Sequence, residues 1–208
     1  MEPTETAGEA ETAGTAPARG RPRSQEARRA VLDAALRLCQ EDGYQELTIK
    51  GIADTAGVGR QTVYRWWHTK ADILVEALVD LRRRFPDGLF PDTGDTLRDV
   101  ETLLESTFAL TRSSTGRAIT GLMADAQSDG RLSAVLREEV IGPRRAHLRG
   151  ILERGVERGE LAQQPPVSLD LAVDFAFGTM WYRLLDRHGP VDEALAAEIT
   201  AGLSKLLT

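Results

Sequence analysis

The chain has 208 residues, of which 41% are hydrophobic and 28% charged, a composition typical of a globular protein with one or two domains and a sizeable core. Its single cysteine, Cys39, excludes an intrachain disulfide or a site with several cysteine ligands, and no apolar run reaches the roughly 18 residues of a membrane span. Because the N-terminus has no hydrophobic signal core either, we expect a cytoplasmic protein that does not enter a membrane.

The formal net charge of −6 is distributed unevenly along the chain. Residues 1–18 carry four acidic and no basic side chains, residues 19–70 carry ten basic and six acidic ones, and residues 71–208 carry sixteen basic and twenty-two acidic ones. Only the second of these segments is net positive, and a local basic surface is what phosphate binding requires.

The first 23 residues are expected to lie outside any folded domain. Residues 1–18 are mainly Glu, Thr, Ala, Gly and Pro, which cannot bury enough surface to offset their ordering entropy, so we expect a disordered acidic tail. Residues 19–23, RGRPR, form a basic arm that resembles an AT-hook core. In an extended arm, Arg21 and Arg23 could enter a narrow A·T-rich minor groove, although a solvated basic linker explains the five residues equally well.

The sequence of residues 24–85 predicts four helices. Ser24 is expected to cap the first helix, which ends at Gly43 and places Cys39 on its apolar face. Thr48 caps the second helix, residues 59–67 form the third, and Thr69 caps a fourth that stops before Pro86.

The second and third of these helices have the spacing of a helix-turn-helix. Gly57 lies where the chain must turn, and glycine takes a left-handed conformation without steric cost. The residues expected to hold the pair together are Ile52, Ala53, Ala56, Val58, Val63 and Trp67. This unit lays its second helix in the major groove of double-stranded DNA.

Residues 24–74 resemble the DNA-binding domain of the TetR family of bacterial transcriptional regulators. The match has no gap and rests on Thr48-Ile49, Ile52-Ala53, Ala56-Gly57-Val58, Thr62-Val63-Tyr64, Trp67, Lys70 and Leu74. The resemblance implies that Tyr64 lies at the DNA surface.

The first turn of the third helix carries the side chains expected to read bases. Arg60 can bond bidentately to guanine and Gln61 to adenine, while Thr62 can touch a thymine methyl group or a phosphate. The alternative for these residues is a solvated polar face without a partner.

Contacts with the phosphate backbone are expected around these base-reading residues. Thr48 and Lys70 lie near helix N-termini, where backbone N–H groups favour anions, and Lys50 is a third candidate. Trp66 stands where the family usually has a histidine that touches phosphate, and its indole N–H could do the same or its ring could pack on a neighbouring helix.

Residues 86–95, PDGLFPDTGD, predict a linker between the DNA-binding domain, residues 24–85, and a second domain, residues 86–208. The second domain predicts helices only, over residues 96–112, 115–127, 131–141, 143–158, 169–187 and 191–207. The chain is therefore predicted to be all-α, with an N-terminal three-helix unit joined by a fourth helix to a C-terminal helical bundle, and about nine to ten helices in total. This second half resembles the ligand-binding and dimerisation domains of the family only in outline.

The last two helices are expected to form a four-helix bundle with their copies in a homodimer. A helix that is apolar on every side, as residues 169–185 are, must be covered on every side. The residues expected at the interface are Phe175, Leu184, Leu195, Ile199, Leu203 and Leu206. A core within one chain is the alternative.

A ligand pocket is expected between the helices of the second domain. Its predicted lining is Leu103, Phe108, Leu122, Met123, Phe177, Met180 and Trp181. Ordinary core packing explains each of these residues as well.

We therefore predict a sequence-specific DNA-binding transcriptional regulator, a dimeric repressor released from a palindromic operator by an unidentified small-molecule effector. No HExxH, GxxxxGK or GxSxG motif is present and the three histidines are widely spaced, so we predict no catalytic residue, metal ligand or cofactor. A helical small-molecule carrier and a non-specific architectural DNA binder are the alternatives.

Overall fold

The computed structural model describes residues 21–84 and 91–208. These residues form helices without a strand, as the sequence predicts. The elements are α1 (Arg21–Asp42), α2 (Ile49–Ala56), α3 (Arg60–Trp66), α4 (Lys70–Arg84), α5 (Thr96–Arg112), α6 (Ser114–Asp125), α7 (Gly130–Val135), the π-helical segment η1 (Leu136–Ile141), α8 (Gly142–Glu157), α9 (Leu169–Asp186) and α10 (Glu193–Leu207).

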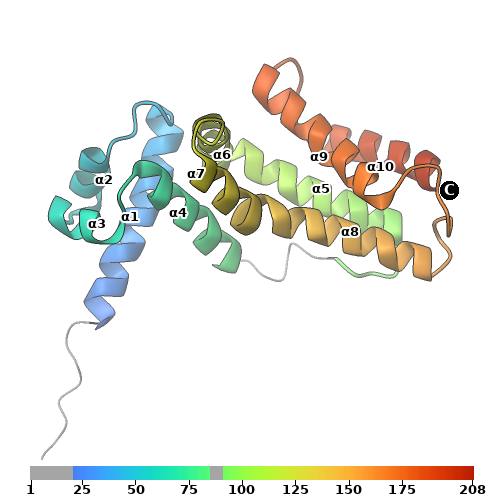
Figure 1. Ribbon diagram of the computed structural model, residues 1–208, viewed down its shortest axis with the longest axis horizontal. Coiled ribbons are helices and arrows are strands. Elements are labelled where there is room, and N and C mark those ends of the chain that lie inside the picture. The colour runs from blue at the N-terminus through green and yellow to red at the C-terminus, as the bar shows by residue number, and fades with distance from the viewer. Residues whose placement is uncertain (1–20, 85–90) are drawn as a thin grey trace, which may run out of the picture.

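The helices are arranged along an elongated molecule (Figure 1). Helices α1 to α4 lie at one end, with α2 and α3 at the tip. Helices α5, α8, α9 and α10 pack together at the other end, and α6 and α7 lie between the two groups.

Local capping decides several of the helix boundaries. The Thr48 hydroxyl accepts a 3.0 Å hydrogen bond from the Gly51 N–H and starts α2, while Gly57, at φ 66°, ends it. At the start of α4, Thr69 and Asp72 each accept a 3.0 Å bond from the other's backbone N–H. These positions confirm the predicted start and end of α2 and the predicted start of α4.

The start of α1 differs from the prediction. The helix begins at Arg21, so Ser24 lies inside it instead of capping it. Pro22 suits this start because its fixed φ is helical and its missing N–H is not needed in the first turn. The expected extended arm is therefore wrong for Arg21 and Arg23, which belong to a helical turn, whereas the rest of the arm and the tail, residues 1–20, fall outside the described residues.

Residues 130–157 form one uninterrupted helical segment, whereas the sequence predicts two separate helices. The segment η1 joins α7 to α8, and the Gly142 N–H bonds to the Arg137 carbonyl five residues earlier. A β-carbon at Gly142 would lie 2.6 Å from that oxygen, so the wide turn needs glycine there. Such π-helical segments occur mostly as single turns within α-helices, and frequently at functional sites.

Two hydrophobic clusters hold the molecule together. The first joins α1–α4 to residues beyond the predicted linker, including Ile119 and Leu122 of α6 and Leu136 of η1, and it buries Cys39 completely. The second joins α5, α8, α9 and α10. Because the first cluster crosses the predicted linker, α1 and α4 pack directly on α6, and α4 also contacts η1.

Candidate DNA-binding surface and ligand cavity

Helix α3 has one buried face and one outward face. Val63 is fully buried and Trp67, directly after the helix, is 3% exposed, so both anchor α3 in the first cluster. Arg60 and Gln61 are exposed on the outward face, and Tyr64 is 49% exposed. The helix therefore presents its polar first turn to solvent at the tip of the molecule.

The outward side chains have no competing partner among the residues that the structure describes. The side chains of Arg60, Gln61 and Lys50 form no hydrogen bond or ion pair with any residue that the structure describes. Thr48 is exposed at the start of α2, and Thr62 is partly buried. Together these residues form an uncompensated polar surface with two positive charges, which we call the α3 surface.

An ion pair and an indole hydrogen bond connect α3 to α1 and α4. Trp67 Nε1 donates to Glu76 Oε2 at 2.8 Å, and Arg28 Nε and Nη2 each bond to a Glu76 carboxylate oxygen at 2.5 Å. The three residues come from α1, α4 and the end of α3, so the contact orients the α3 surface relative to its scaffold.

The Trp66 side chain is partly buried against the first cluster. Its ring meets that of Trp67 edge to face, with centroids 5.4 Å apart, and the Arg28 and Arg65 guanidinium groups lie 5.8 and 5.6 Å from its centroid. Of the two roles expected for Trp66, the ring has the packing role. Its indole N–H bonds to no described residue.

Lys70 differs from its expected role. Its ammonium group donates to the carbonyl oxygens of Tyr44 and Gln45 at 2.7 and 3.1 Å and lies 4.4 Å from the Tyr44 ring centroid. The expected phosphate contact of this charge is therefore corrected to a bridge between α4 and the loop after α1.

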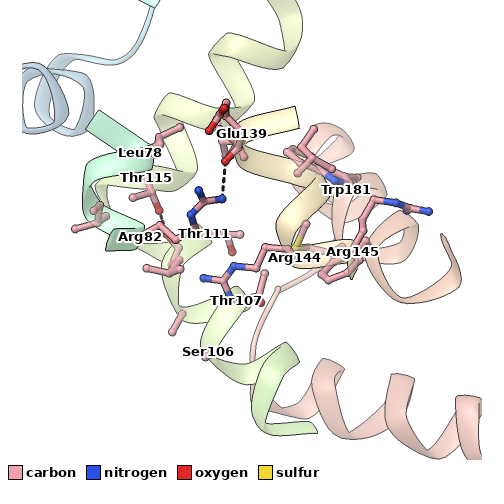
Figure 2. Close-up of a pocket in the computed structure, with 18 residues that line it drawn as sticks. Leu78, Arg82, Ser106, Thr107, Thr111, Thr115, Glu139, Arg144, Arg145 and Trp181 are labelled. Carbon is pink, nitrogen blue, oxygen red and sulfur yellow. Dashed lines mark hydrogen bonds between the residues drawn. The ribbon is translucent and has the colours of Figure 1, made fainter. Parts of the chain in front are cut away.

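A cavity of about 530 Å³ opens between α4, α5, α6, η1, α8 and α9 (Figure 2). This volume is in the range of small-molecule sites. Of the predicted lining, Phe177, Met180 and Trp181 belong to the wall. The other four are corrected: Leu103, Phe108 and Leu122 are fully buried in the two clusters, and Met123 packs against the first.

The sequence did not single out the polar groups of the cavity. Arg82 of α4 and Arg144 and Arg145 of α8 reach its wall, as does Thr107 of α5. In the sequence these arginines resemble the solvated face of a helix, and only the packing of distant helices turns them toward one space.

The exposed surface of α9 is partly apolar. Leu171, Phe175, Tyr182 and Leu185 of α9 are 41%, 43%, 64% and 57% exposed, and they follow one another on one face of the helix. The opposite face, which includes Ala176 and Phe177, is buried. The described part of the chain thus covers this apolar helix on one side only.

The residues predicted for a dimer interface separate into three groups. Phe175 is exposed on this uncovered face, and Leu184, Ile199 and Leu206 are partly buried against the second cluster. Leu195 and Leu203 are each 2% exposed and belong to the core of their own chain, so their expected interface role is corrected.

Two further features bear on other kinds of site. The described residues hold no group of three or more His, Cys, Asp and Glu side chains placed to bind a metal ion. No helix among them is both long and apolar enough to cross a bilayer.

Comparison with known proteins identifies both halves of the chain. Residues 31–77 match the family model described as bacterial regulatory proteins, tetR family, and residues 90–203 match the tetracyclin repressor-like C-terminal domain. The chain is 30% identical over 188 residues to the uncharacterized HTH-type transcriptional regulator YdeS of Bacillus subtilis, covering 90% of this chain and 92% of that protein.

Two more relatives agree with this result. The DNA-binding transcriptional repressor TetR of Mycobacteroides abscessus is 28% identical over 182 residues, which are 88% of this chain and 92% of that protein. The crystal structure of the TetR family transcription regulator SCO0332 superposes with a TM-score of 0.69 at 29% identity, covering 88% of this chain and 99% of that one. The chain therefore belongs to the TetR family, and it is a DNA-binding transcriptional regulator.

Proposed function

We propose that the protein is a homodimeric repressor that acts in the cytoplasm and leaves a palindromic operator when a small molecule fills the cavity. The observation that carries the proposal is the α3 surface, where Arg60, Gln61 and Lys50 project without a partner among the described residues. Side chains of these types make the bidentate base contacts and phosphate contacts of major-groove readers.

Release by a ligand requires that the cavity and the α3 surface share an element. Helix α4 supplies Leu78, Leu81 and Arg82 to the cavity wall and Glu76 to the contact that orients α3. A ligand that prefers a different position of α4 shifts the population of dimers away from the operator by its difference in affinity between the two states.

The uncovered face of α9 supports the homodimer. Four exposed apolar side chains on one helix face favour burial against a second copy, and a dimer buries them by twofold symmetry. Two α3 helices about 34–36 Å apart then meet successive major grooves on one side of the duplex.

Selection of bound fragments from the source genome, followed by footprinting, tests the DNA-binding role. We expect Arg60→Ala to weaken binding to the selected operator roughly tenfold to hundredfold and to relax base preference at one position. Lys50→Ala should weaken binding to all DNA sequences alike. It should also reduce the steepness of the plot of log binding constant against log salt concentration by about one. The matched control is Arg98→Ala, which removes the same charge from an exposed position of α5, far from α3.

Two outcomes contradict the proposal. Failure to retain any double-stranded DNA at low salt favours a small-molecule carrier. Loss of all binding on deletion of residues 1–23, with Arg60→Ala unaffected, favours an architectural binder that uses its N-terminal arm.

A further inference from the structure

Two of the arginines that line the cavity form no ion pair with a carboxylate in residues 21–84 and 91–208. Arg82 Nη1 donates to the main-chain oxygen of Glu139 at 2.7 Å, and Arg144 Nη1 donates to the Thr107 hydroxyl at 2.9 Å (Figure 2). Neither guanidinium forms an ion pair with a residue that the structure describes. Both acceptors are neutral, so neither guanidinium is paired with a described carboxylate, although Glu139 also belongs to the cavity wall.

The third arginine of the cavity wall has an anionic partner. Arg145 follows Arg144 on α8, but its Nη2 lies 2.6 Å from the carboxylate of Asp174. One of the three cavity cations is thus neutralised within the described chain and two are not.

The environment of Arg144 makes its isolated charge unfavourable. Burial, and next the positive charge of Arg82, lower the pKa of Arg144 to about 10. The group stays protonated at neutral pH, and holding an unpaired cation away from water is costly. A bound anion would offset this cost, because guanidinium groups form strong paired hydrogen bonds with carboxylate and phosphate.

The rest of the wall is mainly apolar. Phe177, Met180 and Trp181 of α9 lie across the cavity from α4, and Leu78 and Ile119 close it toward the first cluster. We propose that the cavity binds an amphipathic anion whose carboxylate or phosphate head lies between Arg82 and Arg144 and whose apolar body contacts α9. This inference rests on the ligand-binding role proposed above for the same cavity.

Arg82 connects the proposed head-group site to α4, which belongs to the DNA-binding end of the molecule. Arg82 belongs to α4, and its present partner is a carbonyl of the π-helical segment η1. An anion that takes up the Arg82 N–H donors competes with this carbonyl, so binding changes the contact between α4 and η1.

Calorimetry on the full chain without DNA tests the proposal. The probes are laurate, dodecyl phosphate and dodecanol, which share one alkyl chain and differ in the head group. We expect at least one anion to bind and dodecanol to bind at least about tenfold more weakly, because a hydrogen bond to a charged group contributes roughly that factor or more. The better anion identifies the head group.

Three variants locate the head group. Arg82→Met and Arg144→Met should each weaken binding of the anion by about tenfold to hundredfold, whereas Arg145→Met, with its partner Asp174 in place, should keep the wild-type affinity. The melting temperature of unliganded Arg144→Met should not fall, since the substitution removes an unpaired cation, and this separates lost binding from lost folding.

Equal affinity for dodecanol, no binding of either anion, or unchanged anion affinity in Arg144→Met would overturn the inference. Arginine-dependent binding of an anion that does not release operator DNA would support it, while contradicting the effector mechanism under Proposed function. The two proposals therefore fail on different measurements.

Discussion

The ring of Tyr44, in the loop after α1, lies directly against Gly121 of α6. A β-carbon at Gly121 would be 2.2 Å from Cγ of that ring, and the Tyr44 hydroxyl donates to the carboxylate of Asp125 on the same helix. Tyr44 is 5% exposed, and its carbonyl also accepts the Lys70 ammonium group. One residue thus connects the DNA-binding helices, the start of α4 and α6, which contributes to the wall of the ligand cavity.

Substitution of Gly121 is expected to disturb this junction. Gly121→Ala forces the Tyr44 ring to move, so we expect a loss of about 1–3 kcal/mol in the free energy of unfolding, measured by urea denaturation. Gly150→Ala is the control, because a β-carbon there meets only the end of Arg154 at 3.6 Å and alanine favours the helix. Equal stability of the two variants would show that the junction accommodates the methyl group.

The carboxylate of Glu76 is expected to hold α3 in position. Glu76→Ala leaves the Trp67 N–H and the Arg28 guanidinium without their acceptor, so we expect a loss of about 1–2 kcal/mol in stability, given the partial exposure of the pair. Operator affinity should fall without a change in base preference, because no base contact is removed. Glu26→Ala, at an exposed position of α1, should change neither quantity.

Glu160 is expected to make stability depend on pH in acid. Hydrogen bonds from Arg158 and from the Thr96 N–H lower the pKa of Glu160 from 4.5 to about 2. The unfolded chain takes up the proton first, so this contribution to stability is complete above about pH 4.5 and is lost as the pH falls toward 2. Unfolding free energies measured across this range should fall less steeply for Glu160→Gln than for the wild type, and parallel curves would contradict the assignment.

The uncovered face of α9 is expected to be the dimer contact. A charge placed there must be desolvated on association, so Phe175→Asp and Tyr182→Asp should shift the protein to a monomer in analytical ultracentrifugation and weaken operator binding. Tyr64 on α3 has a similar exposed fraction, so Tyr64→Asp is the control: it should weaken DNA binding and leave the sedimentation of the free protein unchanged. A dimeric Phe175→Asp would place the interface elsewhere.

The helix boundaries could be predicted because they depend on near neighbours in the chain. Thr48, Thr69 and Gly57 act on backbone groups within a few residues, and the periodicity of Val63 and Trp67 turns Arg60 and Gln61 outward. The departures at Ser24 and at η1 are local as well, since Pro22 and Gly142 permit a longer first helix and a wide turn that capping preferences do not require.

What the sequence by itself determined is the series of helices, their apolar faces and the polar first turn of α3. Tertiary structure alone decided that Phe108 and Leu195 fill cores while Trp181 lines a cavity, that the Lys70 ammonium group bonds to carbonyls of its own chain, and that Arg82 and Arg144 line one cavity. The physical reason is that periodicity identifies which side of a helix avoids water, whereas the element that covers this side, and any gap left between them, depends on how distant segments pack.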